Sequence, residues 1–300
     1  MNKIAIIGFL LFLGSHQFIF PSGDETKQDS IIESSENKTD TSKTKKFVYT
    51  FKIHQNIEPS AFRLTKKAFK QAREKKADYI IVDLDTYGGL VNIADSIRSA
   101  FLDSEIPVIV FIRNNAASAG ALISIAADSI YMKKGSSIGA ASVVNQEGEI
   151  MPEKYQSYMR STMRATAEAK GKKIITEDGE TKEVWRRDPR IAEAMVDPRI
   201  TIKGITDSTE IVTFTVQEAI KHSYCEGEAN NLKEVLQEAN IKEAKIERYQ
   251  VTTMDKIIGF LMSPALQGIL IMLIVGGIYF ELQSPGLGFP IVAAITAAAL

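Results

Sequence analysis

A serine among small residues and a pair of consecutive glycines are the residues of this chain whose types and spacing suit covalent chemistry. Ser118 lies in the segment 115–120, Asn-Ala-Ala-Ser-Ala-Gly, and Gly88 and Gly89 end an earlier turn. Acyl transfer needs a hydroxyl at a helix N-terminus and backbone N–H groups directed at a developing oxyanion. We therefore consider Ser118 as a nucleophile and the amides of Gly88, Gly89 and Ala119 as oxyanion donors.

Ser118 also has a simpler interpretation, because serine is strongly preferred as the N-cap of a helix. The Ser-Ala-Gly sequence is short and fits either role. The small neighbours of Ser118 would let a substrate backbone approach closely, and glycine allows a turn to direct its N–H groups outward. Spacing alone leaves both interpretations open.

Two buried strands are expected to carry these motifs. Residues 79–84 and 108–112 are short apolar runs rich in β-branched residues, which is typical of strands buried on both faces of a parallel sheet. The first run ends shortly before Gly88 and the second shortly before Ser118, and apolar residues at helical spacing follow each turn. Because the carboxyl ends of parallel strands meet at one edge of a sheet, we expect the two turns to lie together.

Strands alternate with helices along the rest of the domain, which predicts an α/β fold with a parallel sheet and flanking helices. Further strands are expected near 47–53, 129–132, 211–215 and 244–251, and helices near 57–76, 90–102, 121–127, 153–170, 190–196, 216–223 and 231–238. The polar segment 172–187 is expected to form a hairpin with its turn at 178–179. We expect the folded domain to span 47–250.

The composition argues against several classes of function. The chain of 300 residues has a formal net charge of −1 and no basic stripe, so a nucleic-acid partner is not expected. Its one cysteine, Cys225, leaves no internal disulfide and no cysteine cluster for zinc, and we interpret it as a structural thiol. We expect neither a metal nor another cofactor.

Apolar segments near both ends predict a membrane protein. Residues 1–20 have the length of a signal peptide or an uncleaved anchor, and the polar segment 21–46 is expected to be a flexible linker. Residues 257–300 are expected to form two transmembrane helices, of which the second is still running at the last residue. The export signal predicts that the folded domain lies on the extracytoplasmic side of the membrane.

Three ordered motifs carry a resemblance to a known family. They are 85–89 (Asp-Thr-Tyr-Gly-Gly), 115–120, and 135–140 (Gly-Ser-Ser-Ile-Gly-Ala). Together they resemble the NfeD-type membrane-bound serine proteases, a branch of the superfamily of the Clp protease, signal peptide peptidase A and the crotonases. The resemblance implies a Clp/crotonase-like domain with Ser118 as the nucleophile and Gly88-Gly89 as the oxyanion site. It also implies a stomatin-like or flotillin-like membrane partner and contact with membrane lipid, and it allows a homo-oligomer.

The general base is the part of this site that the sequence does not supply directly. Residues 119–199 contain no histidine, so a Ser-His-Asp triad of the Clp type is not available. The resemblance implies a lysine instead, and alignment of the following helix on Gly171 places Arg164 at the position of that lysine. Arginine stays protonated in proteins, so it cannot accept the serine proton.

Several interpretations of Arg164 remain open. Lys154 or Lys170 could supply the amine from another turn of the helix, Arg164 could convert the site into a binding pocket, or the alignment could be shifted by one turn. An ordinary surface ion pair would also explain the arginine. We expect Arg164 to point toward Ser118 with no lysine in reach, and Arg164→Lys to raise hydrolysis by restoring an amine that burial can deprotonate.

The leading hypothesis is a membrane-anchored serine endopeptidase that acts on apolar segments of a membrane partner. The alternative is a catalytically impaired membrane scaffold that keeps the fold and binds the same partner. Crotonase-like acyl-CoA chemistry is a weaker third hypothesis, because export would separate the domain from cytoplasmic CoA.

Overall fold

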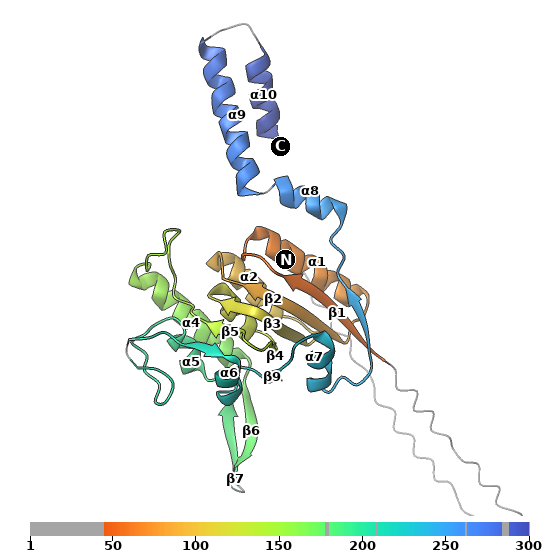
Figure 1. Cartoon of the computed structure of the whole chain (residues 1–300), viewed down its shortest axis with the longest axis vertical. Coiled ribbons are helices and arrows are strands. Elements are labelled where there is room, and N and C mark those ends of the chain that lie inside the picture. Colours follow the sequence, from red (N-terminus) through yellow and green to blue (C-terminus); the bar gives the residue numbers. More distant parts are fainter. Residues whose placement is uncertain (1–44, 178–179, 208, 262, 284–287, 300) are drawn as a thin grey trace, which may run out of the picture. The chain divides into compact units, whose positions relative to one another are not determined.

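The computed structural model describes residues 45–177, 180–207, 209–261, 263–283 and 288–299. The strands of its main sheet are β1 (Lys46–Ile53), β2 (Tyr79–Thr86), β3 (Val108–Ala117), β4 (Ser129–Met132), β5 (Ser137–Gly139), β8 (Thr213–Thr215), β9 (Gly227–Glu228) and β10 (Ala244–Arg248). All neighbours in the order β10-β1-β2-β3-β4-β9 are parallel. Strand β5 lies beside the end of β3 (Figure 1) and pairs antiparallel with β8. This arrangement confirms the predicted α/β class.

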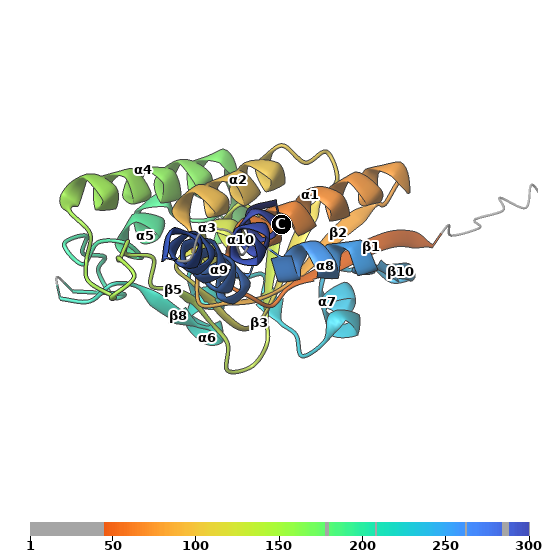
Figure 2. The ribbon, with the colours of Figure 1, turned by 90° about the horizontal axis from the view of Figure 1, so that it is seen from above.

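Helices cover both faces of the sheet. The helices of the domain are α1 (Pro59–Glu74), α2 (Val91–Leu102), α3 (Ala119–Ile125), α4 (Glu153–Ala169), α5 (Pro189–Ala194), α6 (Val216–Lys221) and α7 (Leu232–Glu238). Apolar residues of α1, α2, α3 and α4 form the larger core on one face, and α7 packs over a smaller core on the other. Figure 2 shows α1, α2 and α4 along one side of the sheet. The central strands are therefore buried on both faces, as their continuous apolar sequences predict.

The spacing of apolar residues in α1 explains how it lies on the sheet. Ala61, Ala68, Phe69 and Ala72 are buried on one face of the helix. Phe69 stacks on Phe101 of α2, with 5.4 Å between the ring centres. The lysines of α1 lie on the remaining, more exposed side, which is the arrangement of an amphipathic helix at a protein surface.

Strand β3 is longer than the sequence predicts, and this difference positions Ser118. The sequence predicts a turn after residue 112, but β3 continues to Ala117 because its last residues pair with β5, with Ala117 opposite Gly139. Ser118 therefore follows directly on a paired strand. The backbone on its N-terminal side is held by sheet hydrogen bonds rather than by a loop.

The predicted polar hairpin is present as a separate two-stranded sheet. Strands β6 (Lys172–Glu177) and β7 (Glu180–Trp185) pair antiparallel, and the predicted turn residues 178–179 lie outside the described residues. Lys172 forms a 2.8 Å ion pair with Glu183, and its Nζ lies 5.1 Å from the centre of the Trp185 ring. Side chains from both strands therefore pack across the hairpin.

Three helices follow the domain, namely α8 (Thr253–Leu261), α9 (Pro264–Gln283) and α10 (Phe289–Ala299). Within α9, the window Leu266–Gln283 is long and apolar enough to cross a membrane, and α10 is a shorter apolar helix. The apolar region expected from residue 257 is thus divided between α8 and α9. The proposed signal peptide, and the proposed linker up to residue 44, lie outside the described residues.

Candidate active site

Ser118 occupies a sharp strand-to-helix turn between β3 and α3. Its backbone has φ 54° and ψ −116°, a combination that side-chain-bearing residues rarely adopt. The Ser118 N–H donates to the carbonyl oxygen of Gly139 at 2.9 Å, which fixes the turn against β5. Strained turns of this kind between a strand and a helix can hold a nucleophilic serine clear of the backbone.

The capping interpretation of Ser118 is wrong. Ser118 is the N-cap residue of α3 by position, but its side chain makes no capping hydrogen bond. Among the described residues, no hydrogen bond to the Ser118 hydroxyl is found from a lysine or from any other group. The hydroxyl is therefore free to meet a ligand.

The structure brings the glycine turn against Ser118, as the sequence predicts. Gly88 has a φ of 123°, and a Cβ added to it would lie 2.8 Å from Ser118 Cβ and 3.2 Å from Ser118 Oγ. Gly89 has a φ of 151°, and its added Cβ would lie 2.4 Å from the carbonyl oxygen of Ile57. Both positions require glycine. A side chain at Gly88 would collide with Ser118, and a side chain at Gly89 would collide with the Ile57 backbone just before α1.

The predicted oxyanion donors differ in availability. The Gly88 N–H already donates to Thr86 Oγ1 at 3.2 Å. Within the part of the chain that the structure describes, the N–H groups of Gly89 and Ala119 have no acceptor. Both residues line the same cavity as Ser118, so these two amides are the available donors at the site.

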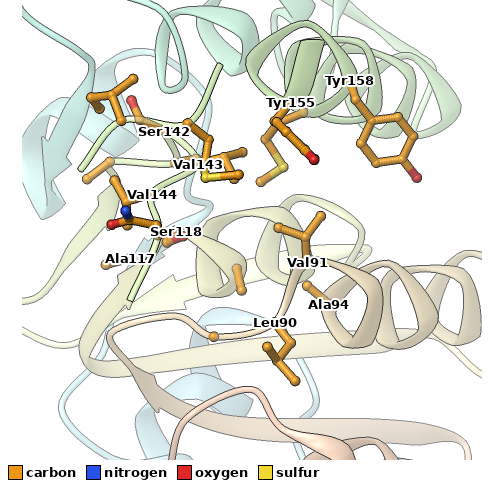
Figure 3. A pocket seen from close by; sticks show the side chains of 18 of the residues that line it. Leu90, Val91, Ala94, Ala117, Ser118, Ser142, Val143, Val144, Tyr155 and Tyr158 are labelled. Carbon is orange, nitrogen blue, oxygen red and sulfur yellow. The ribbon is translucent and has the colours of Figure 1, made fainter. Parts of the chain in front are cut away.

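A cavity of about 1440 Å³ opens at Ser118 (Figure 3). Leu90 and Val91, at the start of α2, form one side of it, and Tyr155 and Tyr158 of α4 form another. The apolar side chains at its rim are unusually exposed: Tyr158 is 55% exposed and Leu90 is 50% exposed. An exposed apolar patch of this kind around a cleft is typical of a binding site for an apolar ligand.

A short hairpin over residues 143–151 forms a further wall of the cavity. Val144 and Ile150 form an antiparallel bridge, and both side chains line the cavity and are exposed. The buried Gln156 side chain fixes the base of the hairpin, since it accepts from the Val143 N–H at 3.0 Å and donates to the Val143 carbonyl at 2.6 Å. This hairpin is not predicted above, although Asn145 and Gly148 are residues that favour a turn there.

Helix α4 presents a different face to the cavity than the sequence alignment predicts. Lys154, Tyr155, Tyr158 and Met159 line the cavity, whereas Arg164 pairs with Glu193 at 2.5 Å and its side chain is 46% exposed. At 3.6 residues per turn, Arg164 lies about 140° around the helix from Met159. The expectation that Arg164 points toward Ser118 is therefore wrong. The sequence does not predict the two tyrosines as site residues. Their spacing with Met159 nevertheless marks an apolar face on this charged helix.

The two lysines considered as bases lie in different surroundings. Lys170 pairs with Asp128 at 2.6 Å, and its side chain is only 12% exposed. Lys154 lines the cavity, and its Nζ lies 4.9 Å from the centre of the Tyr155 ring. Of the described lysines, Lys154 alone shares the cavity with Ser118.

A network of ion pairs holds the first half of α4 in place. Arg160 of α4 bonds Asp197 at 2.5 Å and Glu153 at 2.6 Å, and Arg199 pairs with the same two carboxylates. Hydrogen bonds from Arg199, together with the charges of Arg199 and Arg160, outweigh burial and lower the pKa of Asp197 to about 2. The network thus fixes the wall that carries the tyrosines to the segment after α5.

A cluster of titratable groups around Asp83 and a buried thiol lie outside the cavity. His54 bonds the buried Asp83 at 2.8 Å, and Arg113 bonds the same carboxylate. Burial favours a raised pKa for Asp83, but the hydrogen bonds from Arg113 and His54 outweigh it and lower the pKa below its usual value. Cys225 is buried, which raises the pKa of its thiol to about 12 and agrees with a structural role.

Solved structures with this fold include proteases. The "1510-N membrane-bound stomatin-specific protease", as a lysine-to-alanine mutant in complex with a substrate peptide, is similar with a TM-score of 0.58 and 24% identity, covering 73% of this chain and 98% of that one. The same protein from Pyrococcus horikoshii, described as specific for a stomatin homolog, gives a TM-score of 0.52 and 21% identity, covering 73% of this chain and 100% of that one. At these identities the likeness shows the fold, an α/β domain with a mostly parallel sheet.

Sequence comparison gives the family. Membrane protein NfeD1b of Bacillus subtilis is 32% identical over 254 residues, 84% of this chain and 55% of the relative. Membrane-bound protease PH1510 of Pyrococcus horikoshii is 25% identical over 270 residues, 82% of this chain and 55% of the relative. The chain thus spans about half the length of the curated relatives it matches. Residues 47–249 match the family model "NfeD1b, N-terminal domain", and the chain belongs to this family of membrane proteins.

Proposed function

We propose that this chain is a membrane-anchored serine endopeptidase in which Ser118 attacks the carbonyl of an apolar peptide segment. The observation that carries the proposal is the placement of Ser118. Its strained turn leaves the hydroxyl without a partner among the described residues, beside Gly88 and at the edge of an apolar cavity. A hydroxyl held in this way suits nucleophilic attack on a bound carbonyl.

The proposed steps use groups that line the cavity. Ser118 Oγ bonds to the peptide carbonyl carbon while its proton passes to the neutral amine of Lys154, and the Gly89 and Ala119 N–H groups stabilise the oxyanion. The proton then passes to the leaving amine as the C–N bond breaks, and water later releases the acyl group from Ser118. Lys154 is exposed in the free protein, so a peptide bound against Tyr155 would have to exclude water from the amine before it could act as the base.

The substrate we propose is an apolar segment of a stomatin-like or flotillin-like membrane protein. The support is the apolar rim of the cavity and the similarity to a protease described as stomatin-specific. Apolar side chains of an extended segment would pack on Leu90, Val144 and Tyr158, and would displace water from the rim.

A direct test uses the full chain in lipid bilayers, a serine-directed covalent probe and an apolar peptide substrate. The wild type should be labelled and should cleave the peptide, and Ser118→Ala should lose both while it unfolds at nearly the same denaturant concentration. Ser96→Ala is a matched control, because Ser96 lies on the exposed side of α2 and its hydroxyl bonds the Asn92 carbonyl. Equal turnover by the wild type and Ser118→Ala would overturn the proposal.

A second candidate function, binding without hydrolysis, is favoured by one observation. Among the described residues no base contacts the Ser118 hydroxyl. Lys154, the lysine that lines the same cavity, is exposed. Absence of probe labelling and cleavage in the wild type, together with peptide affinity that falls in Tyr158→Ser, would support this scaffold role.

We also propose that the domain lies on the extracytoplasmic side of the membrane, on the basis of the export-like sequence of residues 1–20. Fusing a reporter after Gln250 tests it. A reporter that works only outside the cytoplasm should be active, and activity of a cytoplasm-only reporter would contradict the proposal.

A further inference from the structure

Helix α8 carries an apolar stripe that nothing in the described chain covers. None of its residues is buried, and Met254, Ile257 and Phe260 are 62%, 48% and 65% exposed. At 3.6 residues per turn, these side chains fall within about 120° of the helix surface, centred on Ile257. We call these three residues the α8 stripe. Such a stripe on a surface helix indicates an apolar environment outside the protein.

The other side of α8 is fastened to the protein. Asp255 forms an ion pair with Lys67 of α1, and its carboxylate accepts from Tyr249 Oη at 3.0 Å and from Thr252 Oγ1 at 2.7 Å. The Asp255 N–H in turn donates to Thr252 Oγ1 at 3.1 Å. Asp255 lies about 160° around the helix from Ile257. The α8 stripe therefore faces away from the contacts that hold α8 to α1.

The continuation of the chain identifies what covers the stripe. Helix α9 starts at Pro264, three residues after α8 ends, and its window Leu266–Gln283 has a mean hydropathy of 1.6. A short amphipathic helix directly before a membrane-spanning helix lies at the depth of the lipid headgroups. Lys256, one turn before Phe260, is exposed beside the stripe and can extend toward lipid phosphates.

We propose that α8 is an interfacial helix, with the α8 stripe inserted at the boundary between lipid headgroups and acyl chains and Asp255 fastening the domain to it. The lipid surface is the partner of this face. The inference goes beyond the proposed peptidase activity and holds whether or not Ser118 is catalytic. Its consequence is that α1, and with it the domain, stays close to the bilayer surface.

The test places a fluorescent label on each side of α8 in the full chain, reconstituted into bilayers. Ile257→Cys puts the label at the centre of the stripe, and Gly259→Cys puts it about 160° away. A Cβ added at Gly259 meets nothing within 4 Å, so this control is sterically tolerated. The wild type measures background labelling, since Cys225 is buried.

Lipids with brominated acyl chains should quench the label at 257 at least about twofold more than the label at 259, and aqueous iodide should show the reverse order. Equal quenching of both labels by iodide, with no effect of brominated lipid, would overturn the proposal. Protection of the label at 257 from both quenchers would also overturn it, because a protein partner rather than lipid would then cover the stripe.

Asp255→Asn tests the fastening separately. Energy transfer from a label at Lys66→Cys, on the exposed side of α1, to an acceptor lipid should fall in Asp255→Asn, while quenching at 257 by brominated lipid stays unchanged. Glu74→Gln is the control, because its 3.8 Å pair with Lys70 is on α1 itself. Unchanged energy transfer in Asp255→Asn would show that this carboxylate does not hold the domain to α8.

Discussion

Two of the walls of the cavity are built in different ways. The wall that carries Ser118 is made of backbone, and glycine is required at Gly88 and Gly89 because any Cβ there would approach other atoms to less than 3 Å. The wall formed by α4 is made of side chains, of which Tyr155 and Tyr158 are 40% and 55% exposed. Residue type is therefore tightly constrained on the first wall and loosely constrained on the second.

This difference in constraint on residue type explains which parts of the site the sequence predicts. A backbone wall admits few residue types, so its glycines and small residues form motifs. A helix face admits many side chains, and which residues point inward depends on how the helix packs on the core through buried residues such as Met159 and Met163. Substitutions on the two walls should differ in cost accordingly.

The largest effect is expected at the backbone wall. Gly89→Val would place a branched side chain against the Ile57 backbone, at a φ that valine does not adopt, and should destabilise the protein by about 4 kcal/mol or more. Urea unfolding measures the loss. Gly148→Ala is the control, since its φ is also positive, at 85°, but nothing lies within 4 Å. It should cost only about 1–2 kcal/mol, and an equal cost in both variants would remove the steric explanation.

A smaller effect is expected inside the α4 wall. Met159 is 1% exposed, so Met159→Ala should cost about 3 kcal/mol through lost burial and the cavity left behind. Tyr158→Ala, one residue earlier and facing the cavity, should change stability by less than about 0.5 kcal/mol. Denaturant midpoints compare the two directly. Similar losses of stability in the two variants would mean that the Tyr158 side chain is packed against the protein in solution. The α4 wall would then be as constrained in residue type as the backbone wall.

The ion pairs behind α4 should make this wall sensitive to acid. The pKa of Asp197 is about 2 in the folded protein, below the ordinary value of 3.8, so its ionised form stabilises the fold above about pH 4. That contribution, about 1–2 kcal/mol, is lost as the pH falls from 4 to 2. Unfolding at several pH values measures it. Asp197→Asn should remove this part of the pH dependence, and the exposed Glu105→Gln should leave it in place.

The smallest effect is expected at Arg164. The Arg164 side chain is 46% exposed and its charge is retained in lysine, so Arg164→Lys should change stability by less than about 0.5 kcal/mol and should not raise peptide hydrolysis. This reverses the expectation from the sequence, which places Arg164 beside Ser118. A clear gain of hydrolysis in Arg164→Lys would mean that α4 rotates or shifts when substrate binds.

The sequence predicts the backbone wall well because its constraints are local. The apolar runs of β2 and β3, the glycine turn and the serine turn are each recognisable within a few residues, and the parallel sheet brings them together. The length of β3 is not predicted, because the polar and small residues at 114–117 are typical of a turn. They extend the strand only because β5 pairs with them.

The second wall depends on contacts that no local pattern contains. The direction of Arg164 is set by Glu193, and the hairpin over 143–151 is fixed by Gln156 from α4. Helix α8 is similar, since the apolar residues from 257 onward read as the start of a membrane span. Asp255 pairs with Lys67, 188 residues away in sequence. Because this contact attaches α8 to α1, we do not count α8 as part of the proposed membrane span in α9.

The backbone strain at Ser118 sets the proposed role of this residue against the stability of the fold. A residue with φ 54° and ψ −116° costs about 1–3 kcal/mol unless it is glycine. Ser118→Gly should therefore unfold at a higher denaturant concentration than Ser118→Ala, although both lack the hydroxyl. If Ser118 is the proposed nucleophile, a related protein that keeps the fold without hydrolysis would gain stability from glycine at this position, so glycine there would mark a non-hydrolytic form.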